Sequence, residues 1–513
     1  MARGLKKLGH LLLSRMVITA LLVLGQVVFL FFEVYKLSSF YVYIDIALRI
    51  ISVGAVVFLL YRPSNPSVKI SWIVFILLLP VLGGLVYVLF GHVFLGKKMG
   101  NSIKRATEAA RQSFDPQSDV LHEIASRDKS VANLCGYIGR YSLTSVCNNT
   151  KATYYPDGEA YWKAILEDLE KAEKFIFVEF FIIEEGEMWD AVHEILRRKA
   201  ASGVEVRVMY DDVGSVFVLP NHYDEKLERE GIKSVAFNKL FPLMAIILNH
   251  RDHRKIISID GKIAYTGGIN MADEYINRKV KFGHWKDTGV RVEGEAAKGF
   301  TMMFLQMWNA MKPTETDFAP YCVQFELGAY QDGYVQPYGD TPLDDETLGE
   351  NIYKNIINNA KDYVWIYTPY LIVDDAMLQS LCLAAKRGVD VRIVTPGIPD
   401  KRVAYWLTQS NYSVLLQAGV KILQYTPGFI HAKCVLCDDA IATVGTVNMD
   451  YRSFFHHFEC GALLFQTSVS KTLKQDMLQT FAMSEEITPE WLKEHVATNL
   501  LFGPILKLLA PLF

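Results

Sequence analysis

Residues 253–270 read HRKIISIDGKIAYTGGIN, and residues 431–448 read HAKCVLCDDAIATVGTVN. Both stretches follow the pattern H-x-K-x4-D-x6-G-[GT]-x-N with identical spacing. One copy could be an accident of a surface hairpin, whereas two copies with the same spacing indicate an internal repeat. The pattern therefore predicts that the chain contains two related halves.

The segments that precede each copy support this duplication. A strand-like run, a helical run ending in glycine and a second strand-like run occur in the same order in both places, and GVEVRVM (203–209) matches GVDVRIV (388–394) almost letter for letter. This order predicts a parallel strand pair with a right-handed crossover. We therefore predict an α/β fold with two similar halves, each built on a central mixed sheet and related by a pseudo-twofold axis.

Three apolar stretches open the chain, at about residues 16–35, 40–61 and 70–91. The first and third are long enough to cross a bilayer, which takes about 20 apolar residues, whereas Asp45 and Arg49 interrupt the second. One short apolar region would fit a signal peptide, but three do not. We expect N-terminal transmembrane helices, and basic clusters on both sides of this region favour an even number of crossings with both clusters in the cytoplasm.

This reading divides the chain into four parts. They are a membrane segment of two or three helices (1–96), a linker with a small region (97–150), a first half (151–335) and a second half with an amphipathic tail (336–513). A net charge of −3 gives no basic field for nucleic acid. Seven cysteines without a disulfide framework fit a reducing compartment, and Cys434 and Cys437 fit core packing better than zinc binding.

Alternation along a strand places the polar residues of the motif. The H-x-K residues are two positions apart, so His253 and Lys255 should project from one face, as should His431 and Lys433. An Asp-Gly hairpin turn then returns the chain, so that the motif's final Asn joins this face in each half. The residues that complete this face are Asn270 and Asn448, and the glycines expected to leave room for a ligand are Gly267, Gly268 and Gly445.

The motif's aspartates, Asp260 and Asp438, are also candidate catalytic residues. Each lies seven positions after the histidine, an odd offset that puts it on the other face of a regular strand. Hydrogen bonding to backbone amides at the turn is therefore the favoured role over catalysis.

Two histidines, two lysines and two asparagines around one point suit a phosphodiester. The lysines and asparagines offer positive charge and donors to its oxygens, while one histidine attacks phosphorus and the other protonates the leaving alkoxide. The charge balance needs no metal and no cofactor. Asp287 and Glu459 follow the two motifs and are candidates for orienting the histidines.

The doubled motif resembles the phospholipase D superfamily, and the context resembles bacterial cardiolipin synthases of that type. The supporting segments are LNHRDHRKIISIDGKIAYTGGINMADEYI (248–276), FGHWKDTGVRVEG (282–294), YTPYLIVDD (367–375), IHAKCVLCDDAIATVGTVNMDYRSF (430–454) and NPSVKISWIVFILLLPVLGGLVYVLFG (65–91).

The resemblance implies a metal-independent transfer of a phosphatidyl group between two phosphatidylglycerol molecules, giving cardiolipin and glycerol. His253 would be the nucleophile and His431 the general acid and then base. Lys255, Lys433 and the two asparagines would bind phosphate, and Asp287 and Glu459 would orient the histidines. The protein would lie in the bacterial cell membrane as a multi-pass protein with a cytoplasmic catalytic domain, in contact with lipid and not with nucleic acid; a homo-oligomer stays open.

Three alternatives remain. Phospholipase D hydrolysis to phosphatidic acid uses the same motif, with water as the acceptor. A membrane scaffold with an inactive site conflicts with the intact His, Lys and Asn residues, and a nuclease is usually soluble or basic. Two features depart from the family: the extra segment 16–35, and His457 where Asn is common.

Overall fold

The computed structural model describes residues 39–62, 65–79, 83–90, 97–112, 118–239, 250–315, 317–326, 328–344, 346–495, 506–508 and 510–512. These residues form two compact units, one made of the N-terminal helices with the C-terminal residues and one containing both motif copies. The predicted segment 16–35 lies outside the described residues.

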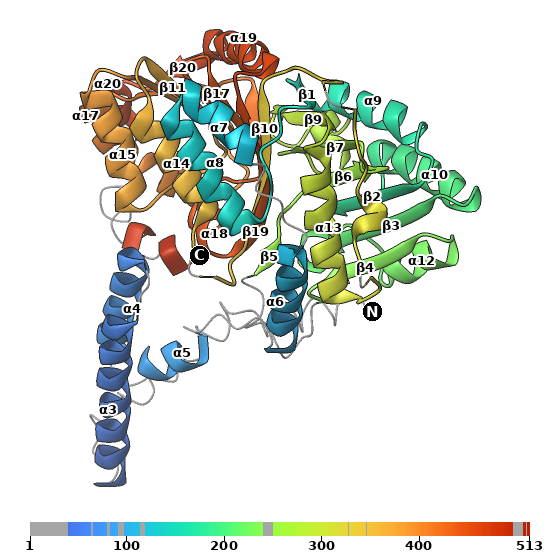
Figure 1. The fold of residues 1–513 in the computed structure, drawn as a ribbon. Helices are drawn as coiled ribbons and strands as arrows, with labels where there is room; N and C mark the ends of the chain where they lie inside the picture. Colours follow the sequence, from blue (N-terminus) through green and yellow to red (C-terminus); the bar gives the residue numbers. More distant parts are fainter. Residues whose placement is uncertain are drawn as a thin grey trace. The chain divides into compact units, whose positions relative to one another are not determined.

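The first half is built on a seven-stranded mixed sheet (Figure 1). Strands β2, β3 and β4 are parallel, and β6, β7, β9 and β1 continue the sheet in antiparallel fashion. The order across the sheet is β1 (Thr150–Tyr155), β9 (Gly289–Gly294), β7 (Ile263–Gly267), β6 (Ile256–Ile259), β2 (Phe175–Phe180), β3 (Glu205–Asp211) and β4 (Lys233–Phe237).

The second half repeats this order strand for strand. Its sheet runs β10 (Tyr334–Asp340), β19 (His457–Phe465), β17 (Ile441–Gly445), β16 (Cys434–Cys437), β11 (Tyr363–Tyr367), β13 (Asp390–Pro396) and β14 (Lys421–Tyr425), with β20 (Ser484–Glu486) added at the edge. Strands β11, β13 and β14 are parallel, and the strands from β16 to β10 are antiparallel. The prediction of two similar halves with mixed sheets is thus confirmed.

Glycines end the crossover helices, as the sequence predicts. Helix α10 (Glu187–Ala201) is followed by Gly203 with φ of 95°, and α15 (Asp375–Lys386) by Gly388 with φ of 94°. This left-handed conformation is unfavourable for other residues and closes a helix C-terminus. Each helix therefore stops where the next parallel strand must begin.

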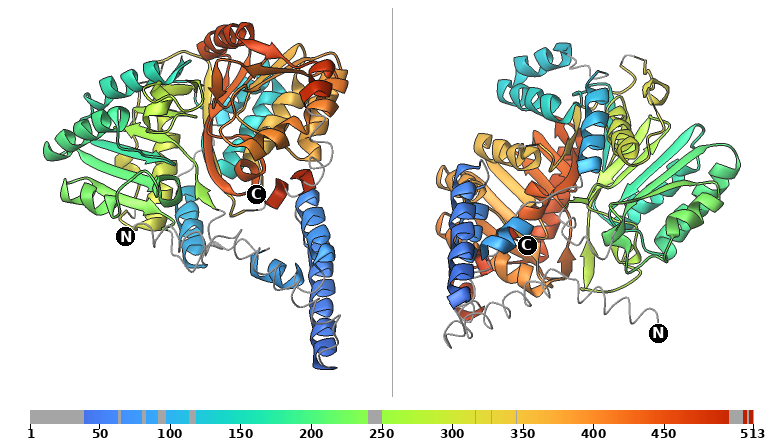
Figure 2. Two further views of the ribbon diagram at one scale, coloured as in Figure 1. Left: turned by 180° about the vertical axis from the view of Figure 1, so that it is seen from behind. Right: turned by 90° about the horizontal axis from the view of Figure 1, so that it is seen from below.

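The two sheets share a core, and helices cover their outer faces (Figures 1 and 2). Alternation along β6 puts Ile256 in the shared core and Ile257 under the first half's outer helices. Likewise Cys434 faces the shared core and Cys437 faces the opposite side of β16, so the pair packs in two cores. The outer helices are α9 (Gly158–Leu169), α10 and α12 (Tyr223–Arg229) in the first half, and α14 (Leu348–Asn359), α15 and α17 (Tyr412–Gln417) in the second.

The small region before the first half belongs to the core of the second half. Helices α7 (Ser118–Arg127) and α8 (Lys129–Ser142) contribute Ile124 and Ile138, which are fully buried against the second sheet's outer-face core. The sequence interpretation of residues 97–150 as a linker with a small region did not foresee this packing, because an amphipathic helix does not reveal which distant surface it covers.

The N-terminal unit contains α3 (Ser39–Tyr61), α4 (Pro66–Leu78) and α5 (Gly83–Phe90). The apolar run 70–91 is divided between α4 and α5, and Asp45 and Arg49 form an ion pair of 2.7 Å along α3. Within the described ranges, no helix combines the length and apolar character that crossing a membrane requires. The predicted transmembrane helices are therefore not established by the fold.

The hairpin of each motif copy is fixed by its aspartate. Asp260 and Gly261 both have positive φ, 54° and 67°, which is the conformation of a type I′ turn between β6 and β7. The Asp260 carboxylate accepts hydrogen bonds from the amides of Glu173, Lys174 and Phe175 at 2.7–2.9 Å. Asp438 accepts from the three corresponding amides at the start of β11, at residues 361–363. Each aspartate therefore ties its hairpin to the start of the central parallel strand.

We expect Asp260→Ala to lower the free energy of unfolding by about 2–4 kcal/mol, because three amides, of which that of Phe175 is buried, lose a charged acceptor. Urea denaturation of the detergent-solubilised protein measures this. Glu167 is exposed on α9, and Glu167→Ala should change stability by less than about 0.5 kcal/mol. Unchanged stability with lost activity in Asp260→Ala would instead indicate a catalytic role.

Candidate active site

Each H-x-K segment is held by the opposite half. Before His253, β5 (Arg251–Asp252) pairs in parallel with the start of β19, and the His253 amide donates to the carbonyl of Phe458 at 2.9 Å. Before His431, β15 (Gly428–Ile430) pairs with β8 (His284–Lys286), and the His431 amide donates to the carbonyl of Lys286 at 2.7 Å. The expectation that H-x-K lies on a regular strand is wrong, because this segment passes from one sheet to the other and β6 and β16 begin after the lysine.

The carboxylates also come from the opposite half. His253 Nδ1 lies 2.9 and 3.0 Å from the two carboxylate oxygens of Glu459, and His431 Nδ1 lies 2.6 Å from Asp287 Oδ2. All four side chains are buried. The sequence suggested both acids but not this crossed pairing. Because Nδ1 is engaged in each ring, Nε2 is the nitrogen available for chemistry.

Burial decides the charge states of these pairs. Desolvation lowers the pKa of His253 and of His431 to about 4 in each case, although the facing carboxylate opposes the change. Burial alone would raise the pKa of Glu459 and Asp287, but the neighbouring histidines lower both pKa values below their usual range. At neutral pH the free site therefore holds two neutral imidazoles and two carboxylates.

The lysines contact the histidine backbones. Lys255 Nζ donates to the carbonyl of His253 at 2.7 Å, and Lys433 Nζ donates to the carbonyl of His431. Lys433 Nζ also lies 2.9 Å from His431 Nδ1. Burial lowers the pKa of Lys255 to about 8 and that of Lys433 to about 7, with nearby carboxylates opposing the change. An anion entering the site would favour the charged form of both lysines.

The two motif asparagines differ. Asn270 Oδ1 accepts from the amide of Ile182 at 3.1 Å, and Nδ2 donates to Tyr275 Oη at 2.6 Å. Asn448 is equally buried, but its Oδ1 has no hydrogen-bond partner among the described residues. Tyr275 was not singled out from the sequence; its ring meets His431 edge-on at 5.5 Å and it lies five residues after Asn270.

The glycines make room for protein rather than for a ligand, which corrects the sequence expectation. A Cβ on Gly268 would lie 2.1 Å from the Asp287 carboxylate, and one on Gly267 or Gly445 would lie 2.4 or 2.5 Å from a carbonyl of the adjacent strand. In the second half Thr446 replaces Gly268, and its hydroxyl donates to Glu459. The sequence did contain a sign that Thr446 has a role, because the first motif copy has Gly-Gly where the second has Gly-Thr.

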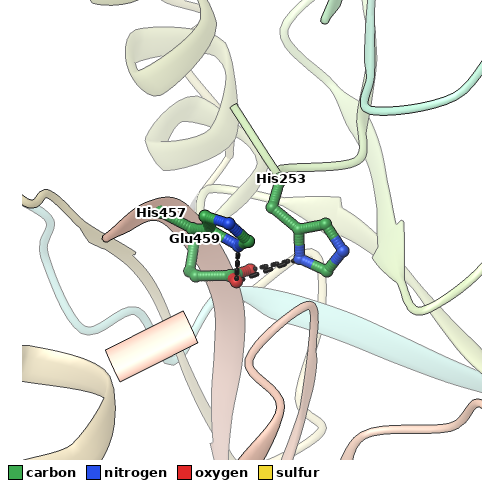
Figure 3. A group of neighbouring side chains, drawn as sticks. All are labelled: His253, His457 and Glu459. Atoms are coloured by element: carbon green, nitrogen blue, oxygen red, sulfur yellow. Dashed lines mark hydrogen bonds and ion pairs between the residues drawn. The ribbon is translucent and has the colours of Figure 1, made fainter. Parts of the chain in front are cut away.

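His457 completes a group of three around one carboxylate (Figure 3). Its ring centroid lies 5.4 Å from that of His253, and its Nδ1 lies 3.6 Å from Glu459 Oε1. Neither ring nitrogen has a hydrogen-bond partner among the described residues. The ligand atoms of His253, His457 and Glu459 lie within 4.8 Å of one another, a spacing compatible with a metal ion. The buried ammonium groups of Lys255 and Lys433 oppose a cation here, so a shared carboxylate is the better description.

Comparisons with known proteins point to one family. Residues 165–308 and 353–481 match a family model described as "Cardiolipin synthase, PLD-like domain", and residues 50–92 match one described as "Phospholipase_D-nuclease N-terminal". Cardiolipin synthase 2 of Bacillus cereus is 34% identical over 463 residues, covering 90% of this chain and 89% of the relative. Cardiolipin synthase of Alkalihalophilus pseudofirmus is 33% identical over 471 residues, covering 91% and 92%.

A solved structure supports the fold alone. Phosphatidylserine synthase of Haemophilus influenzae superposes with a TM-score of 0.53 at 15% identity, covering 71% of this chain and 95% of that protein.

A further sequence relative is an uncharacterised protein of Streptococcus mutans. It is 44% identical over 460 residues, covering 90% of this chain and all of the relative.

Proposed function

This chain belongs to the family of cardiolipin synthases with phospholipase D-like domains and is a phosphatidyltransferase, and we propose that phosphatidylglycerol is both its donor and its acceptor. The observation that carries the proposal is the crossed pair of His–carboxylate contacts. It places each imidazole, with Nδ1 engaged, against a buried carboxylate of the opposite half. Such a pair can act on both sides of a single phosphorus atom.

In the first step, His253 Nε2 attacks the phosphorus of phosphatidylglycerol. The P–N bond forms, the P–O bond to the head-group glycerol breaks, and His431 gives its Nε2 proton to the leaving oxygen. In the second step, His431 takes the proton from a hydroxyl of a second phosphatidylglycerol, whose oxygen attacks phosphorus. The P–N bond breaks, cardiolipin leaves and His253 is regenerated. Lys255, Lys433, Asn270 and Asn448 hold the phosphoryl oxygens by charge and hydrogen bonds.

A difference between the two histidines supports this division of roles. The contacts described for His253 Nδ1 are with a carboxylate, which favours a proton on Nδ1 and a free lone pair on Nε2. His431 Nδ1 faces both Asp287 and the ammonium of Lys433. A hydrogen bond donated by Lys433 to Nδ1 leaves Nε2 as the protonated nitrogen of the neutral ring. His431 is therefore suited to be the acid and His253 to be the nucleophile.

Labelled phosphatidylglycerol should leave an acid-labile phosphohistidine adduct on the His431→Ala variant and none on His253→Ala, because only the former keeps the nucleophile. Both variants should lose turnover by about 10³-fold or more. Quenching with denaturant at mildly alkaline pH preserves the adduct for mass spectrometry, and its loss on acid treatment identifies the P–N bond. His222 is exposed, and His222→Ala should behave as wild type; an adduct on His253→Ala alone would reverse the two roles.

Purified protein given only phosphatidylglycerol in liposomes should form cardiolipin and free glycerol in equal amounts. The transfer balances without another reactant, since the second lipid supplies the attacking hydroxyl. Lipid mass spectrometry and an enzymatic glycerol assay follow the two products, and a variant with both histidines replaced by Ala is the blank. Phosphatidic acid without cardiolipin would mean that water is the acceptor and that the protein is a hydrolase.

We also propose that the N-terminal part holds the protein in the bacterial cell membrane as a multi-pass segment, with the catalytic halves on the cytoplasmic side. Several large apolar side chains of α3 are exposed, including Ile50 at 67%, Val53 at 63% and Leu60 at 61%. Such a surface is typical of a lipid or protein contact. Basic clusters before residue 16 and after residue 96 favour the cytoplasmic side for both.

The full-length protein should stay in the membrane pellet after washing at alkaline pH, because apolar segments and not surface charge would retain it. Protease added to intact spheroplasts should leave the catalytic halves uncut, whereas protease added to inverted vesicles should cut them. Immunoblotting of a C-terminal tag reads both experiments. Release into the supernatant, or cleavage in intact spheroplasts, would contradict the proposed anchoring or its sidedness.

A further inference from the structure

Two surface segments border the His431 side of the site, and we call residues 278–281 together with residues 398–406 the rim. The first segment follows Asn277, whose side chain bonds the amide of Trp285 at 2.8 Å and the carbonyl of Trp285 at 3.1 Å. The Trp285 ring lies 5.5 Å from the ring of His431. This part of the rim therefore follows directly on a residue that is bonded to Trp285, the aromatic residue beside His431.

The second segment includes α16 (Arg402–Gln409), which is fixed on its inner side. Thr408 Oγ1 accepts from the amide of Leu371 at 3.0 Å. Leu371 pairs with Met449, the residue after Asn448, where β12 (Leu371–Ile372) meets β18 (Met449–Asp450). Helix α16 therefore covers the outer side of the strand pair that positions Asn448.

The two segments join beside the site. A Cβ built on Gly283 would lie 3.1 Å from Ile398 Cδ1, and the amide of Ile398 donates to the carbonyl of Gly428 at 3.1 Å. Gly428 opens β15, the strand that leads into His431. The second rim segment, and the residues directly after the first, thus both contact the strand that leads into His431.

The outward face of the rim is apolar. Val280 is 78% exposed, Val403 45%, and Trp406 and Ile398 41% each. Val403 and Trp406 are three residues apart on α16 and share one face, while Leu407 is buried on the other. Large apolar side chains gathered at the entrance of a site, and not scattered singly, indicate an interaction surface.

The charges of the rim are mostly basic. The rim contains Arg278, Lys279, Lys281, Lys401 and Arg402 against one acid, Asp400. The first three pair with glutamates, and the Lys401 ammonium lies 3.8 Å from Asp400 although its side chain is 71% exposed. The unbalanced positive charge of the rim is therefore that of Arg402, at the start of α16. The corresponding loop of the first half, residues 212–222, has no Lys or Arg. The basic charge of this surface is therefore a property of one half, although the first half's loop also exposes an apolar side chain, Phe217, at 79%.

We propose that the rim docks on the anionic surface of a lipid bilayer, with Val403 and Trp406 in the interfacial layer and Lys401 and Arg402 among the head groups. Tryptophan with basic neighbours is the composition that favours this layer. The inference rests on the proposed function: the acyl chains of the substrate stay in the bilayer, so the entrance to His431 has to meet the lipid surface.

Brominated phosphatidylglycerol tests the docking without reference to activity. Full-length protein is reconstituted in vesicles of this lipid or of its unbrominated form, and the emission of Trp406→Phe is subtracted from that of wild type. The difference isolates Trp406 and should fall by about half or more in the brominated vesicles, because bromine quenches an indole within the interface. Equal emission in both vesicles would overturn the proposal, including the case in which an acidic protein occupies the rim.

Activity provides the second test. The double variant Val403→Ser/Trp406→Ser should lose about tenfold in kcat/KM with bilayer phosphatidylglycerol, since two apolar contacts are lost. It should match wild type with monomeric dihexanoyl phosphatidylglycerol. Leu478 on α19 (Ser468–Ala482) is 47% exposed and provides the control Leu478→Ser, which should change neither rate.

An equal loss with both lipids would overturn the docking proposal, because the rim would then serve the site or the fold instead of the bilayer. Absence of turnover by the wild type on either lipid would refute the proposed function. The fluorescence difference would still decide whether Trp406 meets the membrane.

Discussion

The crossed hydrogen bonds between His253 and Glu459 and between His431 and Asp287 are the constraint on which the rest of the structure depends. Each histidine is oriented by an acid from the other half, so neither half contains a complete acid–base group. The two sheets must therefore pack face to face, and the short strands β5 and β15 must cross between them. The site can therefore form only when both copies of the repeated fold are present and packed together.

Burial gives these contacts their chemical effect. A histidine exposed to water would hold a mixture of protonation states near neutral pH, whereas desolvation lowers the pKa of both site histidines to about 4. The same burial lowers the pKa of Lys433 to about 7, so part of its positive charge depends on an anion being present. A site arranged in this way gains its full complement of charge when phosphate enters.

Much of this architecture could be predicted from the sequence, because it follows from local spacing. The repeated strand–helix–strand order predicts the two mixed sheets, glycines mark the helix ends, and the Asp-Gly pair marks the hairpin turn. The sequence did not reveal which acid meets which histidine, because a strand's alternation shows that it has an inner face but not what that face meets. The interpretation of Gly268 failed for the same reason: the group that occupies the place of its missing side chain, the Asp287 carboxylate, comes from the segment between β8 and β9.

The differences between the halves matter as much as the repeat. A transfer in which one imidazole attacks and the other carries a proton needs two unequal histidines, and a perfectly symmetric site could not distinguish them. This chain departs from symmetry around the conserved frame of each motif: Thr446 stands where the first half has Gly268, and His457 stands where it has Trp285. Lys433 contacts the His431 ring, whereas Lys255 bonds the backbone of His253. Thr446 and His457 both lie against Glu459, the acid that faces His253, so the second half sets part of the environment of the first half's histidine. The fold thus repeats the His–carboxylate geometry in both halves, while the groups that bias protonation differ between the two histidines.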